Sequence, residues 1–176
     1  VTVADSGGSI MSGVSVTFTV ASGGGSVTGA TAISGGTGKA AATSWILGTT
    51  AGANTMLAAA GVATATFTAT GTSGAAKKLL FTTQPTPASV NTAIATIRVS
   101  VADSLDNIVT TATPTITLSV GSGTGTLGGT VTAAAVAGVA SFSTVTLNTA
   151  GPFTLTASGT GLAGATSNSF AIFGTP

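Results

Sequence analysis

Apolar and polar residues alternate along most of this chain. The pattern is clearest near residue 18, where Val16, Phe18 and Val20 are apolar and Thr17 and Thr19 between them are polar. A period of two places one set of side chains on a buried face and the other in solvent, which is typical of a half-buried β-strand. The same reasoning predicts strands over residues 1–4, 39–47, 54–59, 62–70, 77–83, 93–102, 139–147, 153–157 and 165–173.

The alternation also assigns inward faces within these strands. We expect Ala65, Phe67 and Ala69 to point into a core, and likewise Leu79 and Phe81 in a later strand. No stretch has a convincing helical period of 3.6 residues. The chain is therefore expected to be all-β.

Turn-forming residues separate the predicted strands. Glycine, serine, asparagine and proline gather at residues 6–9, 22–25, 34–38, 48–53, 84–87, 105–107 and 121–129. These residues favour turns because glycine adopts positive φ and proline cannot continue a strand ladder. Short strands at this spacing predict a β-sandwich and not a parallel α/β sheet.

An internal repeat organises the chain. The opening VTVADSGGSIMSGVSVTFTV of residues 1–20 matches VSVADSLDNIVTTATPTITLSV of residues 99–120, at an offset of 98 that becomes 100 after a two-residue insertion. Further matches reach Gly61 and Gly161. A repeat of about 100 residues has the size of one β-sandwich module. We therefore predict two domains, 1–72 and 73–176, with their boundary in the small residues 71–75.

The first copy is expected to lack its N-terminal strand. No residues before Val1 in this sequence correspond to Lys77–Arg98 of the second copy. This predicts an unpaired edge and an open stripe of core near Val16, Phe18 and Phe67, which would be a template for a further strand. Two interpretations remain open: the strand lies upstream in the same polypeptide, or a neighbouring chain supplies it by β-augmentation.

Composition excludes several classes of partner. Only 4% of the residues are charged, the net charge is +1, and Glu, His, Cys and Tyr are absent. Such a chain has no basic footprint for nucleic acid and no disulfides, and no apolar run approaches the roughly 18 residues of a membrane-spanning helix. Because the sequence does not begin with methionine, we expect a processed or excised piece.

Several longer stretches resemble a known family. Residues 1–27 and 43–61 resemble the bacterial immunoglobulin-like domains of the invasin and intimin kind (Big-1-like), and KLLFTTQP with VADSLDNIV resembles a related repeat of large secreted surface proteins. The resemblance implies two tandem immunoglobulin-like β-sandwiches in extracellular stalks and adhesins. It carries over no catalytic residues.

Two glycine motifs suggest nucleotide binding by their letters alone. Gly123–Gly128 matches GxGxxG, but β-prone residues follow where a phosphate-binding helix would have to begin. Gly38-Lys39 resembles the end of a phosphate loop, but Ile33 replaces the first glycine and Ala40 replaces the Ser or Thr. We interpret both as turns, and we expect no cofactor.

Two further clusters could carry a ligand. Asp103, Asp106 and Asn107 offer oxygen ligands for calcium. Because the first copy keeps only Asp5 of the three, with Gly8 and Ser9 at the other positions, we favour hydrogen bonds that stabilise a turn. Trp45 could be a sugar-stacking platform, although its place in an alternating strand favours the core. We expect no metal site and no catalytic residues.

These observations predict a structural extracellular protein without catalytic activity. It would be a stalk segment of an adhesin or the repeating subunit of a surface filament. A nearly uncharged surface favours association over repulsion, so self-association is expected, through a filament, a tandem stalk or strand complementation of the first domain. The alternative is a ligand- or carbohydrate-binding immunoglobulin-like module of a secreted adhesin or enzyme.

Overall fold

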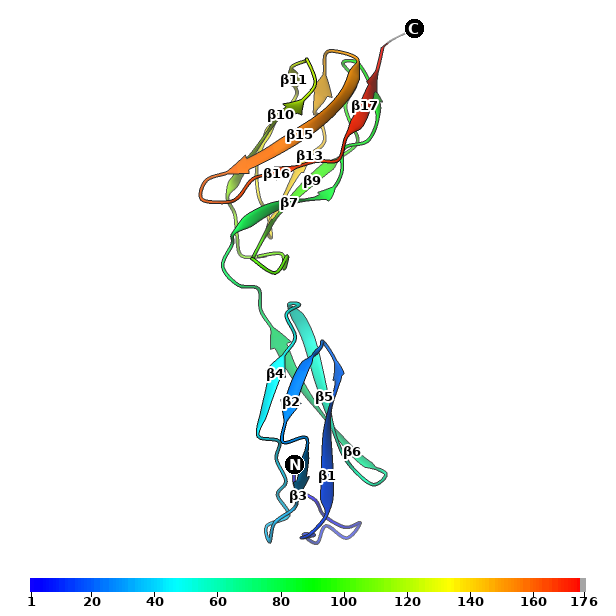
Figure 1. The fold of residues 1–176 in the computed structure, drawn as a ribbon, viewed down its shortest axis with the longest axis vertical. Coiled ribbons are helices and arrows are strands. Elements are labelled where there is room, and N and C mark those ends of the chain that lie inside the picture. The colour runs from blue at the N-terminus through cyan, green and yellow to red at the C-terminus, as the bar shows by residue number, and fades with distance from the viewer. Residues whose placement is uncertain (175–176) are drawn as a thin grey trace. The chain divides into compact units, whose positions relative to one another are not determined.

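The computed structural model describes residues 1–174, and these contain β-strands but no helix. The all-β prediction is therefore confirmed. The chain divides into two compact units, which we call unit 1 (Val1–Thr72) and unit 2 (from Ser73 onward). Both are drawn in Figure 1. Within the described range, no helix is long and apolar enough to cross a membrane.

Unit 1 is built from one four-stranded antiparallel sheet and a separate strand pair. The sheet has the order β3-β1-β5-β6, and β2 pairs with β4. The sequence did not predict β2 and β3, because their short Gly-, Ala- and Thr-rich stretches lack a clear alternation. The strands are β1 Ser15–Ser22, β2 Gly25–Thr28, β3 Thr31–Ile33, β4 Ser44–Leu47, β5 Gly52–Ala60 and β6 Ala63–Gly71.

The predicted first strand of unit 1 is only loosely paired. Residues 1–4 form two single bridges, Thr2 with Lys39 and Ala4 with Ile10. The N-terminal ammonium of Val1 also donates a hydrogen bond of 2.9 Å to the carbonyl of Ala40.

Unit 2 repeats this plan with additional strands. One sheet has the order β12-β10-β15-β17-β8, with β16 also paired to β15; a second has the order β13-β9-β7; β11 pairs with β14. The strands are β7 Lys78–Thr83, β8 Ala88–Ser89, β9 Ile97–Ala102, β10 Thr115–Ser122, β11 Leu127–Gly128, β12 Thr132–Ala134, β13 Val139–Phe142, β14 Thr146–Leu147, β15 Gly151–Gly159, β16 Ala165–Thr166 and β17 Phe170–Phe173.

Strand registers establish which residues of the two units correspond. β1 pairs with β5 as β10 pairs with β15, and each pair carries the same irregularity, at Val20/Ser22 and at Val120/Ser122. The structure corrects one correspondence inferred from the sequence, that of Leu47 with Leu147. Val27 pairs with Trp45 as Leu127 pairs with Leu147. Trp45 therefore takes the place of Leu147 in the ladder.

The two cores differ strongly. Unit 2 encloses a cluster of 17 buried residues, among them Phe142, Phe153 and Phe170, and two of its rings, Phe153 and Phe170, lie 6.4 Å apart. Unit 1 has a cluster of five: Val16, Phe18, Ala40, Met56 and Ala58.

The expected inward face of β6 is only partly correct. Phe67 pairs with Met56, and Ala65 with Ala58, so these side chains do lie on the core side of the sheet. However, Ala65 is exposed and Phe67 keeps 37% of its surface in solvent. The expectation of an open stripe also needs correction, because Val16 and Phe18 are buried and only the β6 portion is open. The reason is that no strand covers this part of β6 within the described chain.

Candidate functional site

The most highly organised polar group in the molecule is the turn that follows β9. Asp103 begins this turn, and its Oδ1 accepts hydrogen bonds from the backbone N–H groups of Leu105 at 2.8 Å and Asn107 at 3.0 Å. Asp106 has a positive φ of 68°, which aspartate tolerates better than most residues. The side chain of Asp103 therefore stabilises the turn that it begins, as Asp commonly does at turns.

The other carboxylate oxygen of Asp103 extends this cluster beyond the loop. Oδ2 accepts the backbone N–H of Gly74 at 2.8 Å and the side-chain amide of Asn107 at 3.0 Å. The Gly74 hydrogen bond, together with those from Asn107 and Leu105, outweighs the opposing effect of burial and lowers the pKa of Asp103 from 3.8 to about 2. We call this group the Asp103 clasp, because it fastens the start of unit 2 to the turn.

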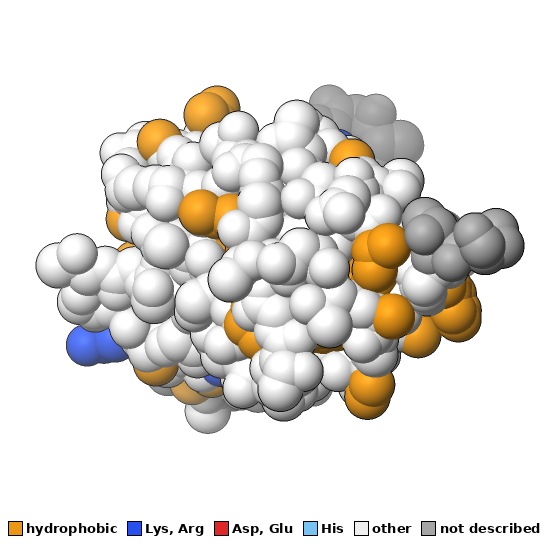
Figure 2. Space-filling model, turned by 90° about the horizontal axis from the view of Figure 1, so that it is seen from above, with side chains coloured by type: hydrophobic (Ala, Val, Ile, Leu, Met, Phe, Trp, Pro, Cys, Tyr) orange, Lys and Arg blue, Asp and Glu red, His pale blue; other side chains and the backbone are white. Residues whose placement is uncertain are grey.

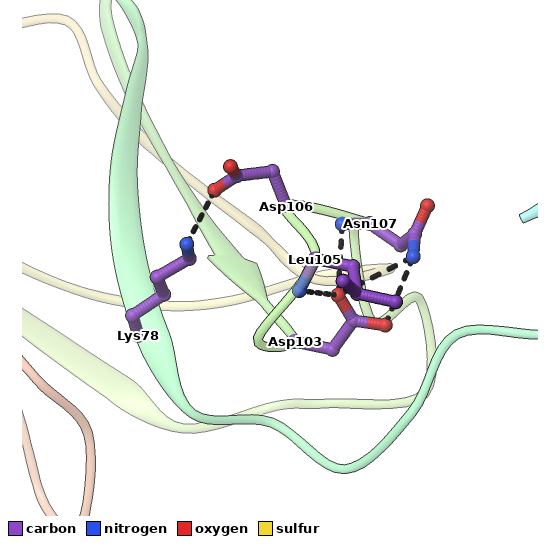
Figure 3. Close-up of polar contacts among 5 residues, drawn as sticks. All are labelled: Lys78, Asp103, Leu105, Asp106 and Asn107. Carbon is purple, nitrogen blue, oxygen red and sulfur yellow. Dashed lines mark hydrogen bonds and ion pairs between the residues drawn. The ribbon is translucent and has the colours of Figure 1, made fainter. Parts of the chain in front are cut away.

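The neighbouring aspartate has a different partner. Asp106 Oδ1 lies 2.7 Å from Lys78 Nζ at the start of β7 (Figure 3). Side-chain exposures of 30% and 63% make this a surface ion pair, which contributes about 0–1 kcal/mol.

This geometry bears on the calcium alternative. Asp103 directs both oxygens at N–H donors, and Asp106 is turned toward the ammonium of Lys78 (Figure 3). The two carboxylates do not converge on a common point, and no group of three or more acidic, His or Cys side chains occurs within residues 1–174. The arrangement therefore supports the turn-stabilising interpretation.

Unit 1 contains the same turn without the clasp. Asp5 Oδ1 accepts the N–H groups of Gly7 and Ser9, each at 2.9 Å, in the positions of Leu105 and Asn107. Within residues 1–72, no further donor bonds to the Asp5 carboxylate as Gly74 bonds to that of Asp103. The sequence could not predict the role of Gly74, because a backbone N–H group leaves no signal in the identity of the residue.

Trp45 belongs to the core side of unit 1. It is partly buried and packs against the unit 1 core cluster, while its neighbour Ile46 is 60% exposed on the other face. Its indole Nε1 is buried, and it has no hydrogen-bond partner within the described structure. These contacts favour the core interpretation of Trp45 over a sugar-stacking platform.

Both glycine motifs are turns, as predicted. Gly123 has a φ of 103°, and a Cβ there would lie 2.5 Å from the ring of Phe153. The motif continues into strand β11 and not into a helix. At Gly38, with a φ of 69°, a Cβ would lie 2.8 Å from the carbonyl of Val3. Close backbone packing therefore explains these two glycines without a phosphate ligand.

Comparisons with known proteins define the fold. No protein-family model matches the chain, and no curated protein sequence does. The D00-D0 domain of intimin is similar over 90% of this chain and 84% of its own length, with a TM-score of 0.51 and 18% identity. The D0-D1 domain of intimin has a TM-score of 0.39 and 21% identity, covering 98% of this chain and 87% of that chain.

A third similar structure is a β-glycosidase from Bacteroides vulgatus, with a TM-score of 0.48 and 15% identity over 89% of this chain. This chain spans only about a fifth of the length of that enzyme, 21%. The similarity to D00-D0 of intimin shows an immunoglobulin-like β-sandwich fold of the intimin type, which confirms the fold prediction. The narrower assignment to Big-1-like repeats stays a prediction.

Proposed function

We propose that this chain is a structural, non-catalytic segment of an extracellular surface protein, where it transmits tension as part of an adhesin stalk or a filament. The observation that carries the proposal is the parallel pairing of β8, an early strand of unit 2, with β17, its last strand. Ala88 and Ser89 of β8 pair in parallel with Ile172 and Phe173 of β17. Near the other end of the unit, Lys78 forms a parallel bridge with Ala163.

This pairing determines how unit 2 responds to a pull on its ends. The chain enters unit 2 at β7 and leaves it beyond β17, at the opposite end of the unit (Figure 1). Because residues 78–89 run parallel to residues 163–173, a pull on the two ends of the unit slides one segment past the other. The hydrogen bonds between them are then loaded together and must break together. They include Leu79 N–H to Ala163 C=O at 2.9 Å and Val90 N–H to Phe173 C=O at 2.9 Å.

The low charge of the surface supports a role in assembly. With four basic and three acidic side chains in the sequence, most exposed positions are Thr, Ser, Ala or Gly. The face in Figure 2 consists mainly of uncharged polar groups and backbone, with scattered apolar patches. Such a surface lacks the charge repulsion that keeps proteins apart, which favours packing against similar modules. The fold similarity to domains of intimin is consistent with this proposal.

Single-molecule pulling tests the proposal with two directions of force on one protein. The sequence contains no cysteine, so handles can be attached at cysteines introduced at chosen exposed sites. Handles at Ala75 and Gly174 load the parallel strands in shear, whereas handles at Ala75 and Thr160 peel β7 from the neighbouring Ala163 one bond at a time. We expect the shear pull to need a rupture force several-fold higher than the peeling pull.

The two double-cysteine variants serve as controls for each other, because each carries exposed substitutions and both should have the same equilibrium stability in denaturant. Unfolding of unit 2 in the shear pull should release roughly 300–350 Å of chain, at about 3.3–3.6 Å per residue. Equal rupture forces in the two directions would contradict a tension-bearing role.

A further inference from the structure

A short stretch of small residues connects the last strand of unit 1 to the first strand of unit 2. β6 ends at Gly71 and β7 begins at Lys78. We call residues 72–76, with the sequence TSGAA, the linker. Segments of glycine, serine and similar small residues behave as flexible coils. Any rigidity of this linker must therefore come from contacts that hold its backbone.

The contacts along the linker are unequal. Within the described chain, the backbone of Thr72 and Ser73 forms no hydrogen bond. The next residue, Gly74, donates its N–H to Asp103 Oδ2 at 2.8 Å. Two residues later, Ala76 packs against the core cluster of unit 2. The Asp103 clasp is thus the first point at which the linker is attached to unit 2.

The side chain of Asp103 is itself held in place to make this contact. It is 3% exposed, and the side-chain amide of Asn107 donates to its Oδ2 at 3.0 Å and lies 3.3 Å from its Oδ1. The Gly74 hydrogen bond is the largest of the causes that lower the pKa of Asp103 to about 2, so the carboxylate is ionised at neutral pH. An N–H bond to an ionised oxygen is stronger than one between neutral groups.

The turn after β9 does not need the oxygen that holds the linker. Asp103 Oδ1 alone accepts the backbone N–H groups of Leu105 and Asn107. Asp5 forms the matching turn of unit 1 with its Oδ1 alone, and Ser9 stands where unit 2 has Asn107. The contact of Oδ2 with Gly74 therefore serves the linker and not the turn.

We propose that Asp103 anchors the linker and thereby confines the free connection between the two units to Thr72 and Ser73. Without the anchor, the free connection extends to Ala75, because Ala76 remains packed against unit 2. The r.m.s. reach of a flexible linker grows with the square root of its length, so a change from two free residues to four increases it about 1.4-fold. The inference is independent of the tension-bearing role, because it depends only on the contacts of the linker.

Hydrogen exchange measured by NMR on the full chain tests the anchor directly. In Asp103→Asn, the remaining oxygen still accepts the N–H groups of the turn, but an NH₂ group replaces Oδ2 and presents a donor to the N–H of Gly74. We expect the Gly74 amide to exchange about tenfold faster in this variant, because its hydrogen bond is lost. The amides of Leu105 and Asn107 should keep their protection.

Distances between spin labels measure the consequence for the connection. The sequence contains no cysteine, so labels can be placed at cysteines introduced at Thr66 of β6 and Thr115 of β10, which are both exposed. The distribution of label-to-label distances, measured by pulsed electron paramagnetic resonance, should be about 1.4-fold broader with Asp103→Asn than without it.

Two matched controls separate the anchor from other effects of substitution. Asp5→Asn makes the same chemical change at the matching turn of unit 1. Gly74→Ala keeps the N–H group, and its Cβ would lie 3.5 Å from Asp103 Oδ2, an ordinary van der Waals contact. Both variants should leave the width of the distance distribution unchanged, and Asp5→Asn should also leave the exchange of the Gly74 amide unchanged.

A second variant keeps the test decisive if Asp103→Asn does not fold by circular dichroism. Asp103→Ser offers one oxygen to the turn and none to Gly74, so it should have the same two effects. The proposal is overturned if the Gly74 amide of the unchanged chain exchanges as fast as an unprotected amide. It is also overturned if no folded Asp103 variant broadens the distribution, or if Asp5→Asn broadens it equally. The pulling experiment has no bearing on these outcomes, so the two proposals can fail separately.

Discussion

The two units share their strand registers but differ in the size of their cores. The comparison therefore separates the features that determine topology from those that determine stability. Both have the same ladder between the equivalents of β1 and β5, and both form the same aspartate turn. Yet 17 residues are buried in the core cluster of unit 2 and five in that of unit 1. Alternation and turns are therefore enough to specify the arrangement of strands, even where few large side chains fill the space between them.

The residues of unit 2 before Val99, which have no equivalent among residues 1–72, account for only part of this difference. Leu79, Ile94 and Ile97 lie there, and all three are buried. Other losses are substitutions at equivalent positions. In the ladder with the last strand, Asn54 and Ala69 of unit 1 stand where unit 2 has Phe153 and Phe170, the ring pair of its core.

The largest expected effect comes from separating the two units. Fragment 73–176 should melt cooperatively as a monomer, whereas fragment 1–72 should not, because its core is too small to offset the entropy of ordering the chain. Circular dichroism melts with light scattering on each fragment measure this. A cooperative, monomeric melt of fragment 1–72 would show that the small core is sufficient.

The next largest effect should follow Phe153→Ala in unit 2. Phe153 is 1% exposed, and removing a buried phenyl ring costs about 3–5 kcal/mol. Because Trp45 is the one tryptophan in the sequence, its fluorescence reports on unit 1, while circular dichroism follows both units. We expect the circular dichroism transition of unit 2 to move to a lower denaturant concentration. An unchanged transition would mean that the pair of rings does not hold the core of unit 2 together.

A smaller effect is expected for Asn54→Ala in unit 1. Asn54 is fully buried, accepts a hydrogen bond from Gly48 N–H at 3.3 Å and donates one to Gly52 C=O at 3.1 Å. Removing it leaves these backbone groups without partners, at a cost of about 1–3 kcal/mol. The midpoint of the Trp45 fluorescence transition should fall accordingly. An unchanged midpoint would indicate that the amide is no substitute for the missing aromatic core.

The Asp103 clasp predicts that unit 2 loses stability in acid. Its hydrogen bonds hold the pKa of Asp103 at about 2 in the folded state, below the ordinary 3.8. The folded carboxyl binds a proton less readily than the unfolded one, so the stabilisation is fully present above about pH 4 and is lost as the pH falls toward 2. Thermal midpoints of unit 2 should decrease in this window, and Asp103→Asn should flatten the decrease. An equally steep decrease in the variant would contradict the clasp.

The smallest predicted effect is a gain in stability at a turn of unit 2. Val136 and Val139 exchange two backbone hydrogen bonds across the two-residue turn Ala137-Gly138, where Ala137 has a φ of 49°. Asn-Gly suits this kind of turn because asparagine tolerates positive φ. Ala137→Asn should raise the stability of unit 2 by about 0.5–1 kcal/mol, measured by denaturant unfolding. A loss of stability would mean that Ala137 is not strained.

The sequence predicted the elements with strong alternation and missed those without it. Val16 and Phe18 were correctly placed in a buried strand, and the two-copy architecture followed from matches such as Asp5 with Asp103. The inward direction of Phe67 was predicted correctly, but its exposure of 37% could not be, because alternation gives the direction of a side chain and not whether another segment covers it. The sequence predicted the turn formed by Asp103 but not its contact with Gly74. Gly74 contributes a backbone N–H group, which the identity of the residue does not reveal.

The parallel seam between β8 and β17 also has a kinetic consequence. It joins segments far apart in sequence: the nearby hydrogen bond from Asn168 N–H to the Gln84 side chain spans 84 residues. Contacts of such separation close large loops and form late in folding, whereas the β5–β6 hairpin of unit 1 can form at once from neighbouring residues. During synthesis, the sheet of unit 2 therefore stays open at this edge until its last strand has emerged. The more stable unit should be the slower of the two to fold, and the slower to unfold once it has closed.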